Sequence, residues 1–266
     1  MSPGSSSATR WADALGRWAI PESILASAPE SPWAFPPSLF KVDAAAGAPL
    51  GESHRTALAA LEGGGSVLDV GCGGGAASVP LVPPATALIG VDAAADMLDS
   101  FASAAADAGV DHQEVQGRWP AVASEVAEAD VVVCHHVAYN VADVVPFLQA
   151  LTNHARRLVV VELTECHPQS PLNPLWERFW GLSRPDEPAA ELLAEVVTDL
   201  GHRPTVRATQ RRPRKALLDR ATYVAFVRRR LCLSEDRDPD IDAALGPDPE
   251  LAVTTVVTVA WEGQAP

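Results

Sequence analysis

A buried strand that runs directly into a glycine-rich turn is the feature that most constrains this chain of 266 residues. Residues 66–70 are mostly apolar or β-branched, as in a central parallel strand, and Gly71, Gly73 and residues 74–75 follow at once. Glycine permits positive φ and a close approach of the backbone to a ligand. The arrangement predicts a turn that binds a nucleotide-like cofactor. With Ala76 the glycines also fit G-x-G-x-x-A, which alone would equally indicate a nicotinamide-binding turn.

Two acids narrow this interpretation. Asp69 lies two residues before the first glycine, where dinucleotide-binding turns more often carry an apolar residue. A carboxylate there can face an ammonium group, which methionine-type cofactors possess. Residues 87–92 resemble a second strand that ends in Asp92, where an acid can accept hydrogen bonds from ribose hydroxyls. The two strands are therefore expected to share one ligand.

These residues give the chain a resemblance to the class I S-adenosylmethionine (SAM)-dependent methyltransferases, which can be followed from about Glu52 to Glu262. Residues 68–75 are similar to the first motif of that family, and Asp92 matches its second acid. The resemblance implies an α/β fold of the Rossmann-like methyltransferase type, with a mostly parallel seven-stranded sheet flanked by helices. It implies SAM as the cofactor. The residues expected to bind SAM are Asp69, Gly71, Cys72, Gly73, Gly75, Asp92, Ala93, Met97, Arg118, Trp119 and His135.

The chain departs from the family pattern at two places. The family often has an acid after the glycine that ends its third strand, but Gly117 is followed here by Arg118 and Trp119. Trp119 either stacks against adenine or packs under the N-terminal segment. The usual Pro-Gly-Gly turn before the fifth strand is replaced by residues 154–157.

Alternating segments after Gly51 predict a doubly wound domain. The expected strands are residues 66–70, 86–91, 112–116, 129–135, 157–163, 204–209 and 252–261. The expected helices are residues 51–61, 75–81, 95–108, 143–153, 173–180, 188–200 and 221–231, of which the second should be shortened by Pro80. Residues 236–250 are expected to form an acidic, proline-bearing loop.

The N-terminal segment has enough apolar surface to dock on this domain. Residues 8–20 place Trp11, Leu15 and Trp18 on one helical face, and prolines at 21, 29, 32, 36 and 37 then break the chain into extended pieces and turns. Trp33 adds further apolar surface. We interpret residues 1–50 as an N-terminal helical cap and 51–266 as a SAM-binding methyltransferase domain with C-terminal helical insertions. The cap either closes over ligands or serves only as a structural brace.

Composition excludes several classes of protein. A hydrophobic content of 47% indicates a globular chain. No run approaches the roughly 18 apolar residues of a membrane helix, and residues 1–10 lack the apolar core of a signal peptide, so a cytoplasmic protein without membrane association is expected. Cys72, Cys134, Cys166 and Cys232 are widely spaced and predict neither a metal site nor a disulfide framework.

Charge is unevenly distributed along the chain. The net charge of −14 disfavours broad nucleic-acid binding, but residues 203–230 carry +9, against −23 for the remainder. This segment is either a basic surface for an acidic substrate or RNA, or a solvated face whose charges pair with acids elsewhere. The second interpretation is preferred, because Tyr223 and Phe226 fit the apolar side of a helix better than a base-stacking platform.

The candidate catalytic residues follow the expected fourth strand, at the edge where open parallel sheets bind ligands. They are His135, His136 and Tyr139, and a histidine here can take a proton from a phenol or a similar acceptor. One of the histidines alternatively caps local backbone or contacts the cofactor. Glu162 and His167 flank the end of the next strand and can enter the same mouth, although Glu162 is alternatively a structural hydrogen-bond acceptor.

The expected reaction is methyl transfer from SAM to an O or N nucleophile of a small molecule. Acidity and an N-terminal cap fit an enclosed pocket better than an open nucleic-acid groove. An RNA or protein acceptor is the alternative within the enzyme class. The other classes are a non-catalytic SAM-binding regulatory protein and, more remotely, a nicotinamide oxidoreductase.

Overall fold

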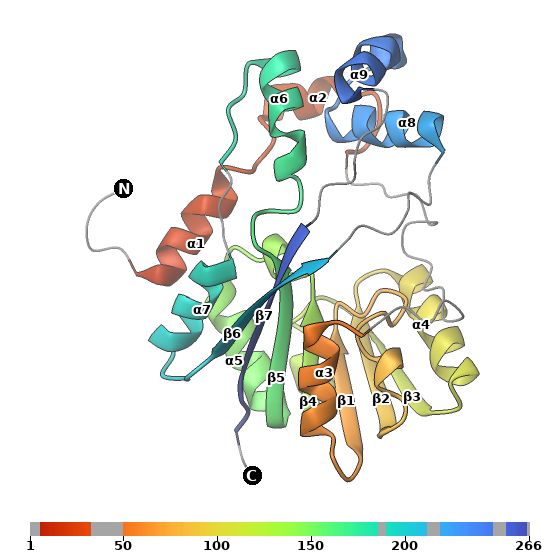
Figure 1. Cartoon of the computed structure of the whole chain (residues 1–266), viewed down its shortest axis with the longest axis vertical. Helices are drawn as coiled ribbons and strands as arrows, with labels where there is room; N and C mark the ends of the chain where they lie inside the picture. The colour runs from red at the N-terminus through yellow and green to blue at the C-terminus, as the bar shows by residue number, and fades with distance from the viewer. Residues whose placement is uncertain (1–5, 33–49, 186–189, 212–218, 247–253, 265–266) are drawn as a thin grey trace.

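The computed structural model describes residues 6–32, 50–185, 190–211, 219–246 and 254–264, and its centre is one seven-stranded sheet (Figure 1). The strand order is β3-β2-β1-β4-β5-β7-β6. The bounds are β1 (Gly65–Val70), β2 (Ala85–Asp92), β3 (Asp111–Gln116), β4 (Ala129–His135), β5 (Ala155–Thr164), β6 (Thr205–Arg211) and β7 (Thr254–Glu262). Only the pairings of β7 with β5 and β6 are antiparallel. The predicted Rossmann-like methyltransferase fold, with a mostly parallel sheet of seven strands, is confirmed.

The buried centre of the sheet explains the apolar runs in the sequence. Val67 and Leu68 of β1 pair with Val131 and Val132 of β4, and all four side chains are buried. Strands covered on both faces need such continuous apolar sequences. The outer strands β3 and β6 are mostly exposed and correspondingly polar.

Helices cover both faces of the sheet (Figure 1). One face packs against α3 (Glu52–Ala60) and α4 (Ala95–Asp107). The other packs against α5 (Val144–His154) and α7 (Ala190–Asp199), with α1 (Ser7–Gly16) outside them. These positions agree with the helices expected from the sequence to within a few residues, so the doubly wound pattern is confirmed.

A separate helical layer lies beyond the carboxyl ends of the parallel strands (Figure 1). It consists of α2 (Glu22–Ser27), α6 (Asn173–Trp180), α8 (Arg220–Arg230) and α9 (Asp238–Leu245). Its apolar cluster includes Ile24, Trp176, Val227 and Ile241, one from each helix. Sequence segments from both ends of the chain therefore build this layer together.

The described part of the N-terminal segment docks in two places. Trp11 of α1 is fully buried, and its indole Nε1 donates to the carbonyl oxygen of Val141 at 2.8 Å. Trp18, after α1, is buried at the helical layer, where its ring stacks on His167 with centroids 3.8 Å apart. Thus α1 lies against α7 and α5, and only the residues after it reach the layer. The expected roles of Trp33, Pro36 and Pro37 fall outside the described residues.

Three sequence predictions are wrong in detail. Residues 75–81 form turns and the short 3-10 helix η2 (Val79–Leu81), because Gly75 has φ 85° and Pro80 lacks an amide hydrogen. Residues 22–27 form α2, not an extended piece, because the buried Ile24 anchors one apolar side. Part of the expected acidic loop is α9, since its proline lies in the first helical turn, where no amide donor is needed, and Ile241 is buried.

The basic segment forms ion pairs with acids from other parts of the chain. Arg207 pairs with Glu52 at 3.4 Å, and Arg220 pairs with Asp242 at 2.6 Å. Arg228 contacts Glu30 at 2.9 Å. These pairs support the interpretation of a solvated, internally compensated face. Within the residues that the structure describes, none of the helices is long and apolar enough to span a membrane.

Candidate functional site

The glycine turn joins the carboxyl ends of β1 and β2. The backbone N–H groups of Gly71 and Cys72 both donate to the carbonyl oxygen of Val91, at 2.8 and 3.1 Å. Gly71 has φ 72°, and a Cβ there would lie 2.3 Å from Val137 Cγ2, so this glycine is required for packing. Gly73 has φ 50° and faces open space. The turn therefore leaves bare backbone at Gly73 for a ligand.

Two other expected cofactor residues in this turn face inward. Cys72 is buried, and burial raises the pKa of its thiol, so the turn offers a ligand the Cys72 backbone and not the sulfur. A Cβ at Gly75 would lie 2.7 Å from Val79 Cγ2, so Gly75 is packed against the residues that follow the turn.

Asp92 ends β2 beside Gly73. Its Oδ2 accepts from the Gly73 N–H at 3.0 Å, and its Oδ1 accepts from the Ala94 N–H at 2.9 Å. The side chain is half-buried, and each carboxylate oxygen keeps a further lone pair. Ala93 is exposed and Met97 half-buried on the adjoining first turn of α4. Asp92 is therefore fixed at the mouth of the sheet with capacity to accept hydrogen bonds from a ligand.

Asp69 is buried in the middle of the sheet. Ser78 Oγ donates to its Oδ2 at 2.6 Å, whereas Oδ1 is buried without a hydrogen-bond partner. Burial, with a smaller contribution from the negative charge of Asp92, raises the pKa of Asp69 to about 7 despite the hydrogen bond from Ser78. An orphaned carboxyl oxygen at this depth fits a cationic or donor group of a bound ligand.

Asp69→Asn is expected to remove a pH dependence from the stability of the ligand-free protein. The folded carboxyl keeps its proton up to about pH 7, and its unfolded pKa is 3.8. Its stabilising contribution is therefore complete below pH 3.8 and is lost as the pH rises through 7. The free energy of unfolding of the wild type relative to the variant should fall by on the order of 4 kcal/mol from about pH 4 to about pH 8. Denaturant unfolding at a series of pH values measures this difference. The prediction is contradicted if the free energies of unfolding of the wild type and the variant change in parallel with pH.

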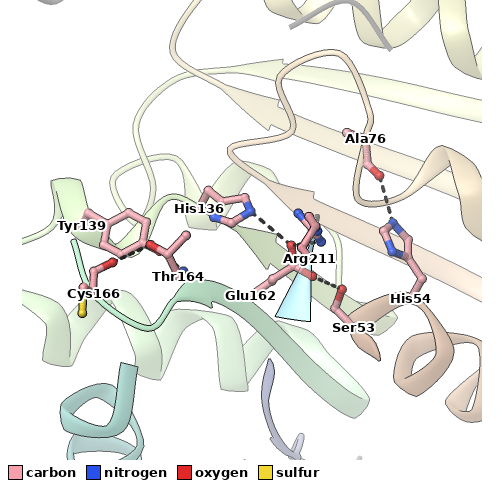
Figure 2. A network of polar contacts seen from close by, with 9 residues as sticks. All are labelled: Ser53, His54, Ala76, His136, Tyr139, Glu162, Thr164, Cys166 and Arg211. Carbon is pink, nitrogen blue, oxygen red and sulfur yellow. Dashed lines mark hydrogen bonds and ion pairs between the residues drawn. The ribbon is translucent and has the colours of Figure 1, made fainter. Parts of the chain in front are cut away.

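Glu162 is the centre of a polar network at the carboxyl end of β5 (Figure 2). Ser53 Oγ donates to Oε2 at 2.5 Å, Arg211 Nη2 contacts Oε1 at 2.7 Å, and His136 Nε2 lies 3.1 Å from Oε1. Burial favours the neutral acid, but the hydrogen bond from His136, the positive charge of Arg211 and the Ser53 hydroxyl hold the pKa of Glu162 well below its usual range. Glu162 is therefore an ionised acceptor that orients its neighbours.

His136 is oriented by this carboxylate. Its backbone has φ 60°, and its N–H donates to the Glu162 carbonyl oxygen at 2.8 Å. An ionised carboxylate only accepts, so the ring hydrogen lies on Nε2 and Nδ1 is the nitrogen free to accept a proton. The side chain is 39% exposed. The arrangement combines a fixed tautomer with an accessible basic nitrogen, which general-base catalysis requires.

His135 has a different environment from its neighbour. Burial lowers the pKa of His135 to about 3, and its Nε2 has no hydrogen-bond partner. Its ring meets the ring of His54 edge-on, with centroids 5.4 Å apart. His54 Nε2 donates to the Ala76 carbonyl oxygen at 3.0 Å, so its buried Nδ1 is a further acceptor without a partner. His135 is thus neutral and keeps a polar atom without a partner, and its contact with the cofactor stays a prediction.

Tyr139 does not point its hydroxyl at this network (Figure 2). The phenol is buried, contacts Thr164 Oγ1 at 2.7 Å and accepts from the Thr164 backbone N–H. Thr164 Oγ1 itself donates to the Cys166 carbonyl oxygen, so the phenol hydrogen goes to Thr164. Burial raises the pKa of Tyr139 to about 12. Tyr139 therefore braces the loops after β4 and β5, and its catalytic role stays a prediction.

The segment after β3 offers less to a ligand than the sequence suggested. Trp119 is buried, its Nε1 donates to the Phe147 carbonyl oxygen at 3.4 Å, and its ring meets His154 edge-on. Trp119 therefore packs against α5, and its stacking on adenine stays a prediction. Arg118 is exposed.

Three residues beside Glu162 and His135 were not identified in the sequence. Ser53 and His54 lie on α3, ahead of the glycine motif, and Arg211 ends the edge strand β6. None belongs to a motif, and a serine, a histidine and an arginine in these elements carry no chemical signal by themselves. The fold brings Ser53 and Arg211 to Glu162 from 109 and 49 residues away.

Comparisons with known proteins agree with this geometry. Residues 67–159 match a family profile described as a methyltransferase domain. No curated protein sequence matches the chain. The YcgJ protein of Bacillus subtilis is a similar solved structure, with a TM-score of 0.54 and 16% identity over 80% of this chain and 99% of that one.

Two further solved structures contain S-adenosylhomocysteine. A SAM-dependent methyltransferase from Thiobacillus denitrificans has a TM-score of 0.50 and 14% identity, covering 81% of this chain and 92% of its own. Magnesium protoporphyrin IX methyltransferase from Synechocystis has a TM-score of 0.50 and 14% identity, covering 80% and 82%. At these identities the likeness is one of fold.

Proposed function

We propose that this chain, which carries a class I SAM-dependent methyltransferase domain, transfers the methyl group of SAM to an O or N nucleophile of a small molecule. The observation that carries the proposal is the turn of β1, whose bare backbone at Gly73 lies beside the fixed carboxylate of Asp92.

The residues of the turn fit SAM as cofactor. The Gly73 backbone leaves room for the ligand, and Asp92 keeps lone pairs for ribose hydroxyls. The orphaned Asp69 Oδ1 and His135 Nε2 are buried polar atoms, which are costly to leave without partners and which a polar ligand can satisfy. We propose that Asp69, Gly71, Gly73, Asp92, Ala93, Met97, Arg118 and His135 line the SAM site, with Cys72 contributing only its backbone.

Bound SAM supplies a methyl group activated by its sulfonium centre, so the protein has to align the acceptor, exclude water and remove a proton where the nucleophile carries one. His136 Nδ1 can accept that proton while Glu162 holds Nε2–H and stabilises the imidazolium that forms. His135 is too weak a base, because burial lowers its pKa to about 3. The structure therefore favours His136 over His135 and Tyr139 as the base.

A small-molecule acceptor is supported by the helical layer beyond the strand ends (Figure 1). This layer stands beside the edge where a ligand of an open parallel sheet binds, which suits an acceptor that can be enclosed. The acidic net charge and the ion pairs of the basic segment argue against a broad RNA surface. Of the N-terminal cap, we propose that residues 18–32 contribute to the enclosure, jointly with the C-terminal helices.

Calorimetry on the purified protein should detect binding of SAM and of its demethylated product, S-adenosylhomocysteine, but not of NAD. The reason is the pair of acids: Asp92 can hold ribose, and Asp69 lies where a dinucleotide-binding turn usually has an apolar residue. Binding of NAD without binding of SAM would overturn the cofactor assignment.

Asp92→Ala is expected to weaken SAM binding by about 1–3 kcal/mol, or roughly 5- to 150-fold in Kd, because ribose loses a charged acceptor. Asp96→Ala, which removes an exposed acid in the next turn of the chain, is the matched control and should leave the Kd unchanged. The melting temperature reports whether the variant is folded, since Asp92 also holds two backbone amides. An unchanged Kd in folded Asp92→Ala would remove this acid from the site.

A further inference from the structure

Arg184 is a buried cation with an unused hydrogen-bonding edge. Its relative exposure is 9%, and its Nη1 donates to the Trp18 carbonyl oxygen at 2.9 Å. The Nε and Nη2 atoms are buried and have no hydrogen-bond partner. In a guanidinium these two N–H groups form one side of the planar fork and point in the same direction, which matches the two oxygens of a carboxylate.

The surroundings of Arg184 hold its plane but do not neutralise its charge. The guanidinium carbon lies 4.0 Å from the centroid of the Trp176 ring and 5.5 Å from that of Trp18. Among the residues that the structure describes, no carboxylate pairs with it. Aromatic faces attract a cation, but they do not satisfy its N–H donors. A guanidinium cannot lose its proton to escape burial, so an anion is the partner that this edge lacks.

Two other arginines of the helical layer have acidic partners. Arg228, also buried, pairs with Glu30 and Asp238. Arg237 lies 5.0 Å from the Phe179 centroid, as Arg184 lies near Trp176, but Arg237 also pairs with Asp240 at 2.9 Å. Arg237 therefore has both an aromatic neighbour and an acid partner, whereas Arg184 has the aromatic neighbours without the acid.

A chain of ring contacts connects Arg184 to the mouth of the sheet. Its neighbour Trp18 stacks on His167, and the His167 ring meets Tyr139 edge-on with centroids 5.6 Å apart. Tyr139 follows β4 in the same loop as His136. Burial and the charge of Arg184 lower the pKa of His167 to about 4, so His167 stays neutral and does not compete for an anion. Arg184 is thus connected through Trp18 and His167 to Tyr139, in the loop that carries His136.

We propose that Arg184 binds the carboxylate of a small anionic molecule through Nε and Nη2, and that this molecule is the methyl acceptor. The identification with the acceptor rests on the proposed methyltransferase function, whereas the anion site itself does not. The substrate class is then a small acid with an O or N nucleophile elsewhere in the molecule.

The site can be tested on the full chain with benzoate as the probe and benzamide as its uncharged counterpart. Thermal unfolding is followed as each is added, because a ligand that binds only the folded state raises the melting temperature. Benzoate should raise it and benzamide should not. Arg184→Lys keeps the charge but loses the two-pronged edge, so its Kd for benzoate should rise by roughly 10-fold or more. Arg237→Gln, the matched control, should respond like the wild type.

Two results would overturn the anion site: equal responses to benzoate and benzamide in the wild type, or equal benzoate binding by Arg184→Lys and wild type. The first comparison needs no variant and decides even if Arg184→Lys does not fold. Inorganic phosphate forms a third arm, and an Arg184-dependent response to phosphate alone would overturn the choice of carboxylate.

The acceptor claim has a separate readout. The product labelled from methyl-labelled SAM should be retained by an anion exchanger above neutral pH, and a methylated product that is not retained would overturn the claim that the acceptor is an acid. SAM binding measured on the same wild-type sample separates the two hypotheses. Benzoate binding without SAM binding would overturn the proposed function and support the anion site. SAM binding without benzoate binding would overturn the anion site and leave the proposed function standing.

Discussion

Replacing His136 with asparagine is expected to lower kcat by roughly 10²- to 10⁴-fold while the Kd for SAM changes little. The expectation follows from the geometry of the ring, in which Glu162 holds Nε2–H and Nδ1 is the accessible base. Asparagine is preferred to alanine because His136 has φ 60°, a conformation that asparagine tolerates better. Turnover is measured with the acceptor fraction that takes up label from SAM.

His135→Ala is the matched control for this variant. His135 is half-buried and neutral, and its Nε2 is buried without a partner, so its loss should weaken SAM binding more than it lowers turnover. The opposite pattern, with turnover lost in His135→Ala and kept in His136→Asn, would transfer the catalytic role to His135. Full activity in both variants would leave alignment by the pocket as the account of catalysis.

Glu162→Gln is expected to lower the free energy of unfolding at neutral pH by roughly 2–3 kcal/mol, the usual worth of hydrogen bonds to a buried charged group. The larger losses of stability that follow from breaking a fully buried ion pair do not apply, because the Arg211 side chain is 46% exposed and can be solvated. The pKa of folded Glu162 lies below its ordinary value of 4.5, so its contribution is present above that pH and is lost as the pH falls through the folded pKa. The difference in the free energy of unfolding between the wild type and Glu162→Gln should therefore become smaller at acidic pH.

Glu52→Gln is the control for the loss of an acid in the same region. Glu52 pairs with Arg55 and Arg207, both well exposed, so its loss should cost at most about 1 kcal/mol. Turnover should also fall in Glu162→Gln, since an amide does not stabilise imidazolium at His136. A Glu162 variant as stable and as active as Glu52→Gln would show that the network neither holds the fold nor orients the base.

The sequence predicts the sheet and the cofactor side of the site better than the acceptor side. Gly71, Gly73 and Asp92 could be identified because one continuous turn and the next strand place them together. Glu162 could be predicted to enter the mouth or to accept structural hydrogen bonds. Its partners could not be predicted, since Ser53 and Arg211 come from elements that are adjacent only in the folded protein. His135 and His136 differ in burial and in their polar partners. Two successive histidines in a sequence do not reveal this difference.

The helical layer was the least predictable part of the fold. Residues 238–245 are rich in aspartate and contain proline, as loops are, yet proline is tolerated in a first helical turn and Ile241 is buried against α8 and its neighbours. Likewise, Trp119 beside a proline could be placed only by its contact with Phe147. In both cases long-range packing decided between local alternatives of similar energy.

The most direct test of the account is incubation of the purified protein with methyl-labelled SAM and fractionated cell extract, followed by separation of labelled material by size. The account predicts label in the small-molecule fraction, and Asp92→Ala should reduce its rate of incorporation at low SAM concentration. Label confined to RNA or protein would contradict the proposed acceptor. Tight SAM binding with no transfer to any fraction would contradict catalysis and indicate a SAM-binding regulatory protein.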